Sequence, residues 1–258
     1  MQKLRGKVAL ITGASHGIGR AIAQGYVKEG ATVVVTGRTE ANLNQLVEEA
    51  EKDGLPALAI PADLEDAATP ANLVQRVLEK FGTIDILVNN AGIGSSAGPS
   101  PVVTFDDALW HRTLNLNLTA PYLLCKASLP TMLKNKKGRI INIASIVGKL
   151  PVIHGAAYSV SKHGLLGLTR TLAVEVARDG ITVNAICPGP VRTRINDLRI
   201  QYDANRLGVT LDEFEANITP IGRRLEPEEI VPMAILLALD ESAAITGQAF
   251  NVCGGVAT

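Results

Sequence analysis

The stretch "KVALITGASHGIG" at residues 7–19 decides the fold. Residues 7–11 are almost entirely apolar and β-branched, which indicates a buried strand. Gly13, Gly17 and Gly19 follow in a G-x-x-x-G-x-G spacing, and a segment of helical period begins at the last of them. A strand, a glycine-rich turn and a helix start bring several backbone N–H groups together, which suits a pyrophosphate. The spacing is a variant of G-x-G-x-x-G, and a turn used only for strand–helix packing is the alternative.

Short apolar runs alternate with segments of helical period along the whole chain. Strands are predicted at 7–11, 31–36, 57–62, 84–89, 138–144, 181–187 and 248–253. Helices are predicted at 17–29, 40–52, 70–81, 105–116, 119–134 and 156–178, with another opening at 226–230. This order predicts a single domain over residues 1–258, an α/β, Rossmann-like, doubly wound parallel sheet of about seven strands with helices on both faces.

Residues 189–226 are the least regular part of the chain and are rich in charge and proline. A long insertion before the last strand of such a sheet is typical of a mobile cover, so we expect a substrate lid here. Its arginines could receive a phosphopantetheine or a carboxylate. Alternatively, they belong to a charged amphipathic helix with Asp197 and Asp203 as partners. The arginines are Arg192, Arg194, Arg199 and Arg206.

Composition argues against several classes of protein. Lys plus Arg and Asp plus Glu number 25 each, so charge gives no basis for binding nucleic acid or an acidic membrane surface. Cys125, Cys187 and Cys253 lie far apart without metal-ligand spacing. We therefore expect no metal site and interpret them as core residues in a reducing compartment. Neither a signal peptide nor a membrane span is indicated, and a cytoplasmic protein is expected.

The ends of the second and third predicted strands bear on the choice of dinucleotide. Gly37 and Arg38 stand where a carboxylate would grip a ribose 2′-hydroxyl. Arg38, helped by His16, could instead pair with a 2′-phosphate, which favours NADP(H) and leaves NAD(H) possible. An exposed charge at a helix start is the alternative for Arg38. Asp63 could accept from an adenine amino group or serve as a helix cap.

The motif "NNAG" at residues 89–92 closes the fourth predicted strand. Ligands of doubly wound sheets bind at this edge. Small Ala91 and Gly92 would admit a ribose or a nicotinamide against the backbone, and Asn90 offers hydrogen bonds.

Six motifs in one order make the chain resemble the short-chain dehydrogenase/reductase family. They are "TGASHGIG" (12–19), "NNAG" (89–92), "NLTA" (117–120), "INIAS" (141–145), "YSVSK" (158–162) and "NAICPGPVRT" (184–193). Each motif is weak alone, and all six at the family's spacing are specific. The resemblance implies an NAD(P)-dependent enzyme that interconverts a ketone and a secondary alcohol. Several framework segments look closest to the ketoreductases of fatty-acid and aromatic polyketide synthesis.

The resemblance implies a catalytic tetrad of Asn117, Ser145, Tyr158 and Lys162. Tyr158 would exchange a proton with the substrate oxygen, and Lys162, one helical turn away, would favour the phenolate and hold the nicotinamide ribose. Ser145 would polarise the substrate oxygen, and Asn117 would support a water that relays protons. Without context, a Tyr–Lys pair at i, i+4 is usually a surface pair, and Ser145 and Asn117 could be caps. Asn115 is a rival to Asn117.

The resemblance also implies a set of cofactor contacts and a homotetramer or homodimer. The long helix after Tyr158 and the C-terminal segment would lie in the interfaces. The implied cofactor contacts are Gly13, Ser15, His16, Gly17, Ile18, Gly19, Arg38, Asp63, Leu64, Asn90, Ala91, Gly92, Tyr158, Lys162, Pro188, Gly189, Val191 and Thr193.

Residues 146–157, "IVGKLPVIHGAA", are expected to line the substrate pocket. They are mostly apolar, with His154 as the polar exception, which suits a carbon-rich ketone. We therefore expect an NADPH-dependent reductase of a 3-oxoacyl or polyketide-like carbonyl. The alternative enzyme is an NAD(P)-dependent secondary-alcohol, sugar or hydroxysteroid dehydrogenase. A non-catalytic dinucleotide-binding protein is a third hypothesis, although a pure binder needs no proton donor.

Overall fold

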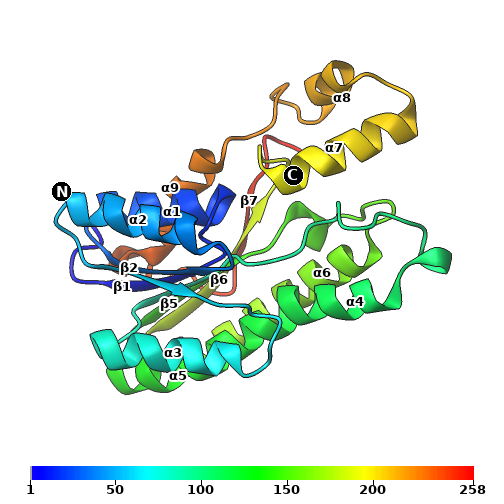
Figure 1. Cartoon of the computed structure of the whole chain (residues 1–258). Coiled ribbons are helices and arrows are strands. Elements are labelled where there is room, and N and C mark those ends of the chain that lie inside the picture. Colours follow the sequence, from blue (N-terminus) through cyan, green and yellow to red (C-terminus); the bar gives the residue numbers. More distant parts are fainter. Residues whose placement is uncertain (1) are drawn as a thin grey trace.

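Parallel strands form a sheet at the centre of the molecule (Figure 1). The computed structural model describes residues 2–258. The strands are β1 (Val8–Thr12), β2 (Thr32–Gly37), β3 (Ala57–Pro61), β4 (Ile86–Asn89), β5 (Gly138–Ile143), β6 (Ile181–Pro188) and β7 (Ala249–Val252). Their order across the sheet is β3-β2-β1-β4-β5-β6-β7, and each neighbouring pair is parallel. The predicted doubly wound parallel sheet is confirmed.

Helices cover both faces of this sheet (Figure 1). One face carries α1 (Gly17–Lys28), α2 (Glu40–Lys52) and α9 (Val231–Ala238). The other face carries α3 (Thr69–Phe81), α4 (Asp107–Leu114), α5 (Ala120–Asn135) and α6 (Ala156–Val176). After β6 the chain forms α7 (Arg194–Leu207) and α8 (Leu211–Asn217), which pack on each other. Within the described part of the chain, no helix combines the length and the apolar character that a membrane crossing requires.

Alternate side chains of one strand enter two different cores. Ala9 of β1 belongs to a core with Ile22 of α1. Its neighbour Leu10 belongs to a core with Leu73 of α3 and Leu124 of α5. Because both faces of the sheet are buried, the strand sequences show no polar alternation.

The strand order reverses beside β1, which pairs with β2 on one side and β4 on the other. The helical connections that follow β1 and β4 pack on opposite faces of the sheet. The loops after these two strands therefore diverge, and a crevice lies between them. This crevice lies at the carboxyl edge of the sheet, where the glycine-rich turn and "NNAG" meet.

Two local predictions differ from the structure. The predicted helices 105–116 and 119–134 are joined, because a π-helical turn at Asn115–Thr119 connects α4 directly to α5. Within the segment 189–226, the charged amphipathic helix that was one of the two alternatives is present as α7, whereas α8 was not predicted. Each of these two helices starts with a threonine cap, and Thr210 forms a capping box with Glu213. Such caps are readable from sequence, so the T-x-x-E pattern was a missed signal.

Candidate active site

The glycine-rich turn after β1 is held against "NNAG" by hydrogen bonds. Gly13 has φ +65°, and a Cβ there would lie 2.8 Å from the Cα of Ala91, so this position requires glycine. Asn90 donates from Nδ2 to the carbonyls of Thr12 and Gly13, at 2.9 and 3.1 Å. Its amide hydrogens are therefore used to hold the turn, and its role in hydrogen bonding to a ligand stays a prediction for its remaining polar atoms.

A hollow at the ends of β2 and β3 fits the adenosine half of a dinucleotide. Ser15, Arg38 and Asp63 line it. The buried Oγ of Ser15 has no hydrogen-bond partner among residues 2–258. A Cβ at Gly37 would lie 2.4 Å from this oxygen, so glycine keeps the position open. An unpaired buried hydroxyl in a pocket is costly unless a ligand completes its hydrogen bonds, so the residues fit a bound nucleotide.

Asp63 and Arg38 have local partners in this hollow. One carboxylate oxygen of Asp63 accepts from the backbone N–H of Glu65 at 3.0 Å, which leaves the other oxygen for a ligand. Arg38 is 65% exposed, and its Nη1 lies 3.7 Å from Oε1 of Glu65. Asp63 and Arg38 therefore both lie at the adenosine hollow. Asp63 can still accept a hydrogen bond from a ligand, and Arg38 can still donate one.

A second hollow, at the ends of β4, β5 and β6, brings Ser145, Tyr158 and Lys162 together. Nζ of Lys162 lies 5.7 Å from the ring centre of Tyr158 and donates to the carbonyl of Ile143 at 2.8 Å. Ser145 Oγ accepts from the N–H of Val147 at 3.1 Å, so its own hydrogen is left for another acceptor. Ser145 thus caps the next turn and lines the cavity at once.

Burial shifts the pKa values of Tyr158 and Lys162 in this cavity. Removal from water raises the pKa of Tyr158, and a hydrogen bond with Ser145 opposes this only in part. Removal from water also lowers the pKa of Lys162 to about 8. In the ligand-free chain, desolvation is the largest influence on the pKa of either group, and the role of Lys162 in favouring the phenolate stays a prediction. A protonated phenol is nevertheless the form that donates a proton.

Asn117 lies within the π-helical turn and is fully buried. Its Oδ1 accepts from the N–H of Ile93 at 2.7 Å, and its Nδ2 donates to the carbonyl of Ile93 at 2.8 Å and to Ser161 Oγ at 3.1 Å. It therefore joins the loop after β4 to α6. Its rival Asn115 donates to the carbonyl of Glu65 at 2.7 Å, away from the catalytic cavity. A water held at Asn117 stays a prediction.

The structure brings nearly all predicted site residues to the two hollows. The catalytic cavity is lined by Gly13, His16, Gly17, Ile18, Asn90, Ala91, Gly92, Ser145, Tyr158, Lys162, Pro188, Gly189, Val191 and Thr193. The adenosine hollow is lined by Gly13, Ser15, His16, Arg38, Asp63, Leu64, Ala91 and Gly92. Gly19 and Asn117 line neither hollow. A Cβ at Gly19 would lie 2.4 Å from the carbonyl of Gly13, so Gly19 serves close packing beneath the turn.

Residues 146–157, expected to line the substrate pocket, do not line either of the two hollows. Ile146 turns into the core, and His154 hydrogen-bonds through Nδ1 to Tyr202 Oη at 2.6 Å, so this loop packs under α7. The cavity wall is built instead from residues that the sequence reasoning missed: Ile93, Gly94, Ser95, Arg194, Ile195, Asn196 and Arg199. Their signals were adjacency to "NNAG" and the cap at Thr193, which marks the start of α7.

Arg199 attaches α7 to both sides of the catalytic cavity. It is nearly buried and forms a two-pronged ion pair with Asp203, at 2.7 and 3.0 Å. It also donates to the carbonyl of Ser95 at 3.2 Å and to that of Ile153 at 2.8 Å. The loops after β4 and β5 are thus joined through one guanidinium, whose charge Asp203 balances.

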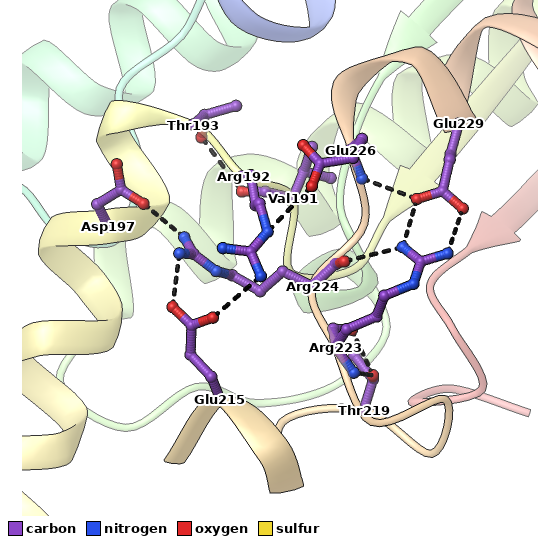
Figure 2. A network of polar contacts seen from close by, with 10 residues as sticks. All are labelled: Val191, Arg192, Thr193, Asp197, Glu215, Thr219, Arg223, Arg224, Glu226 and Glu229. Carbon is purple, nitrogen blue, oxygen red and sulfur yellow. Dashed lines mark hydrogen bonds and ion pairs between the residues drawn. The ribbon is translucent and has the colours of Figure 1, made fainter. Parts of the chain in front are cut away.

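A second group of ion pairs holds α7 to α8 (Figure 2). Arg224, with 8% of its side chain exposed, lies between Asp197 of α7 and Glu215 of α8. Arg192 reaches Glu215 at 3.3 Å and Glu226 at 3.0 Å.

These contacts decide between the two readings of the lid arginines. Arg192 is committed to Glu215 and Glu226, and Asp203 pairs with both Arg199 and Arg206. The amphipathic helix with charged partners is therefore the better description. Among the described residues, Arg194 is the one of the four that forms no ion pair, and it lies at the cavity wall.

Comparison with known proteins agrees with this geometry. The family model for short chain dehydrogenases matches residues 7–202, so the chain belongs to that family. A Streptomyces violaceoruber protein assigned as ketoacyl reductase 1 of the granaticin polyketide synthase is 42% identical over 254 residues, which cover 96% of this chain and 92% of that protein. A 3-oxoacyl-[acyl-carrier-protein] reductase of Thermotoga maritima is 36% identical, covering 98% of this chain and 99% of the relative.

Among solved structures, a variant of the actinorhodin polyketide ketoreductase with NADPH superposes with a TM-score of 0.91 at 39% identity. The match covers 99% of this chain and 98% of that one. The similarity therefore extends over the α7–α8 segment as well as over the sheet.

Proposed function

We propose that this protein is an NADPH-dependent ketoreductase that reduces a 3-oxoacyl or polyketide-like carbonyl to a secondary alcohol. One observation carries the proposal: Ser145, Tyr158 and Lys162 line a cavity that shares Gly13, His16, Ala91 and Gly92 with the adenosine hollow. The two hollows together make one groove for a dinucleotide, with a proton donor at its inner end. A protein that only bound the nucleotide would gain nothing from that donor.

The residues divide the reaction among themselves. When bound, NADPH supplies the hydride that the carbonyl carbon accepts. Ser145 donates a hydrogen bond to the carbonyl oxygen, and Tyr158 gives that oxygen its proton, so the C=O group becomes a CH–OH group. Lys162 holds the cofactor ribose and stabilises the phenolate that remains after proton transfer. The raised pKa of Tyr158 keeps this donor loaded before the reaction.

The segment of residues 189–226 acts as the substrate lid. Support comes from Ile195, Asn196 and Arg199 of α7, which form part of the cavity wall. Arg194, the arginine left without a carboxylate, is exposed and lines the cavity. It binds the phosphate or carboxylate of an acyl carrier, such as a phosphopantetheine.

The enzyme works as a homotetramer or homodimer in the cytoplasm. Support for self-association comes from the outward side of α6, where Val160 and Val174 are 46% and 81% exposed. Support for a reducing compartment comes from the cysteines, which are free and buried. Light scattering on the purified enzyme measures the mass of the assembly, and a monomer would contradict this part of the proposal.

A screen of NADPH consumption tests the proposed reaction. The substrates are 3-oxoacyl thioesters, cyclic ketones, sugars and steroids, each at matched concentration. We expect turnover with the thioesters and the cyclic ketones. Turnover confined to sugars or steroids supports the alternative dehydrogenase. Wild-type enzyme that neither reduces a ketone nor oxidises an alcohol contradicts the proposed function.

A further inference from the structure

The adenosine hollow has a carboxylate beside the arginine that the 2′-phosphate needs. Glu65 follows Asp63 and Leu64, and its Oε1 lies 3.7 Å from Nη1 of Arg38. This distance is too long for a hydrogen bond but lies within the range of a solvent-screened ion pair. A free carboxylate here would compete with a 2′-phosphate for Arg38 and would also repel that phosphate. By itself, the glutamate would therefore oppose the binding of NADPH.

A second arginine forms an ion pair with the carboxylate of Glu65. Arg112 of α4 donates from Nε and Nη2 to the two oxygens of Glu65, at 2.7 and 2.8 Å. The hydrogen bonds from Arg112 lower the pKa of Glu65, and the nearby charge of Arg38 lowers it further. Glu65 is thus ionised and committed to Arg112 by a planar, two-pronged pair.

The backbone of Glu65 is fixed as firmly as its side chain. Its N–H donates to Asp63 at 3.0 Å, and its carbonyl accepts from Nδ2 of Asn115 at 2.7 Å. Glu65 is therefore anchored at three points, and its carboxylate cannot move toward Arg38 while Arg112 holds it.

Charge counting shows the consequence. Arg38, Glu65 and Arg112 together carry one net positive charge, which is left at Arg38. Loss of Arg112 would cancel that charge, because Glu65 would then pair with Arg38. Loss of the Glu65 charge would instead leave two positive charges beside the phosphate.

We propose that Arg112 is a positioning residue for NADPH selectivity, which holds Glu65 away from Arg38 so that Arg38 can bind the 2′-phosphate. The proposal rests on the NADPH use of the proposed function. It names two residues, Glu65 and Arg112, that neither the glycine-rich turn nor the catalytic tetrad includes.

Binding of two nucleotide probes to the full-length enzyme tests the proposal. The probes are adenosine 2′,5′-bisphosphate and 5′-AMP, titrated by calorimetry at about 150 mM salt so that only short-range charge effects remain. They differ only in the 2′-phosphate. The variants are Arg112→Met, Glu65→Gln and the double variant, with Arg112→Lys as the conservative replacement.

We expect wild-type enzyme to prefer the bisphosphate. Arg112→Met should weaken bisphosphate binding about tenfold while 5′-AMP binding changes less than about twofold. Glu65→Gln should strengthen bisphosphate binding severalfold. In the Glu65→Gln background, Arg112→Met should weaken bisphosphate binding by no more than about threefold, less than in wild type, because it removes one of two positive charges but releases no carboxylate onto Arg38. Arg112→Lys should restore part of the selectivity.

Three outcomes overturn the proposal. Equal weakening of both probes in Arg112→Met means that Arg112 only supports the fold of the hollow. An undiminished effect of Arg112→Met in the Glu65→Gln background means that Arg112 acts without Glu65. A wild-type enzyme that binds both probes equally contradicts the NADPH preference itself, and this pattern is separate from the other two.

Discussion

The floor of the cavity and the segment above it are held by different forces. The floor, at the carboxyl ends of the strands, carries Lys162 as a buried cation whose Nζ bonds a backbone carbonyl. The α7–α8 segment carries buried arginines as well, but Arg199 and Arg224 each have carboxylate partners. Burial of Lys162 at the floor therefore lowers the stability of the fold while it places a reactive group. In the α7–α8 segment, by contrast, the ion pairs of Arg199 and Arg224 hold the helices in position. Removal of a floor cation and removal of an arginine above it should change stability in opposite directions.

The largest expected effect is on catalysis. Tyr158→Phe removes the proton donor at the floor while keeping the ring. We expect kcat to fall by about 10³-fold or more, since positioned general acids contribute up to roughly 10⁴-fold. NADPH binding, measured by fluorescence titration, should change only a few-fold. Tyr122→Phe, at an exposed tyrosine of α5, is the matched control. Retained turnover in Tyr158→Phe contradicts the mechanism.

The next effect concerns the α7–α8 segment. Arg224→Met leaves Asp197 and Glu215 without their shared cation, so the free energy of unfolding should fall by about 2 kcal/mol. The control is the adjacent Arg223→Met. Arg223 pairs with Glu229 at the surface (Figure 2) and is 49% exposed, so its loss should cost less than about 0.5 kcal/mol. Urea unfolding measures both, and equal losses would show that burial of the pair is unimportant.

At the floor the sign should reverse. The pKa of Lys162 falls from its ordinary 10.5 to about 8, so below that pH folding must bury an ammonium at a cost of roughly 3 kcal/mol. Because the unfolded chain binds this proton more tightly, the cost fades as pH rises from 8 toward 10.5. Lys162→Met removes the cost but leaves the Ile143 carbonyl without its donor.

We therefore expect Lys162→Met to be inactive yet more stable than wild type by about 1 to 2 kcal/mol near neutral pH. The gain should shrink when unfolding is measured at about pH 10. Lys126→Met, at an exposed lysine of α5, should show no such pH-dependent gain. If Lys162→Met is less stable than wild type at neutral pH, the claim that loss of the floor cation and loss of Arg224 change stability in opposite directions is wrong.

The smallest effect is expected at the cavity wall. Arg194→Ala should raise KM severalfold for a 3-oxoacyl thioester that carries a phosphopantetheine, and leave kcat nearly unchanged. The KM for a small neutral cyclic ketone should not change, because that substrate has no anion for Arg194 to bind. Equal KM changes for both substrates would mean that Arg194 shapes the wall rather than binds an anion.

The floor could be predicted from the sequence, whereas in the segment above it only the local features could: the charged helix α7, its threonine cap and the pairing of Asp203 with Arg199 and Arg206. Motifs such as "TGASHGIG" and "YSVSK" specify local turns and i, i+4 neighbours, so their geometry is encoded within a few residues. Arg199 bonds the carbonyls of Ser95 and Ile153, and Arg224 bonds Asp197, across gaps in the chain that no local pattern shows. The π-helical turn was missed for a related reason, since no residue preference marks it. It was read as a break between helices.

That turn links the two ends of the dinucleotide groove along one rod. Arg112 precedes the turn and faces Glu65, and Asn117 lies within it and holds Ile93. A π-helical turn holds one residue more than an α-helical turn, so it widens the helix locally and lets Asn117 reach Ile93 between two regular helices. Deleting a single residue there would restore an ordinary α-helical turn, with α4 and α5 keeping their directions. The rod would survive the deletion, but the widened turn that carries the Asn117 contact would be lost.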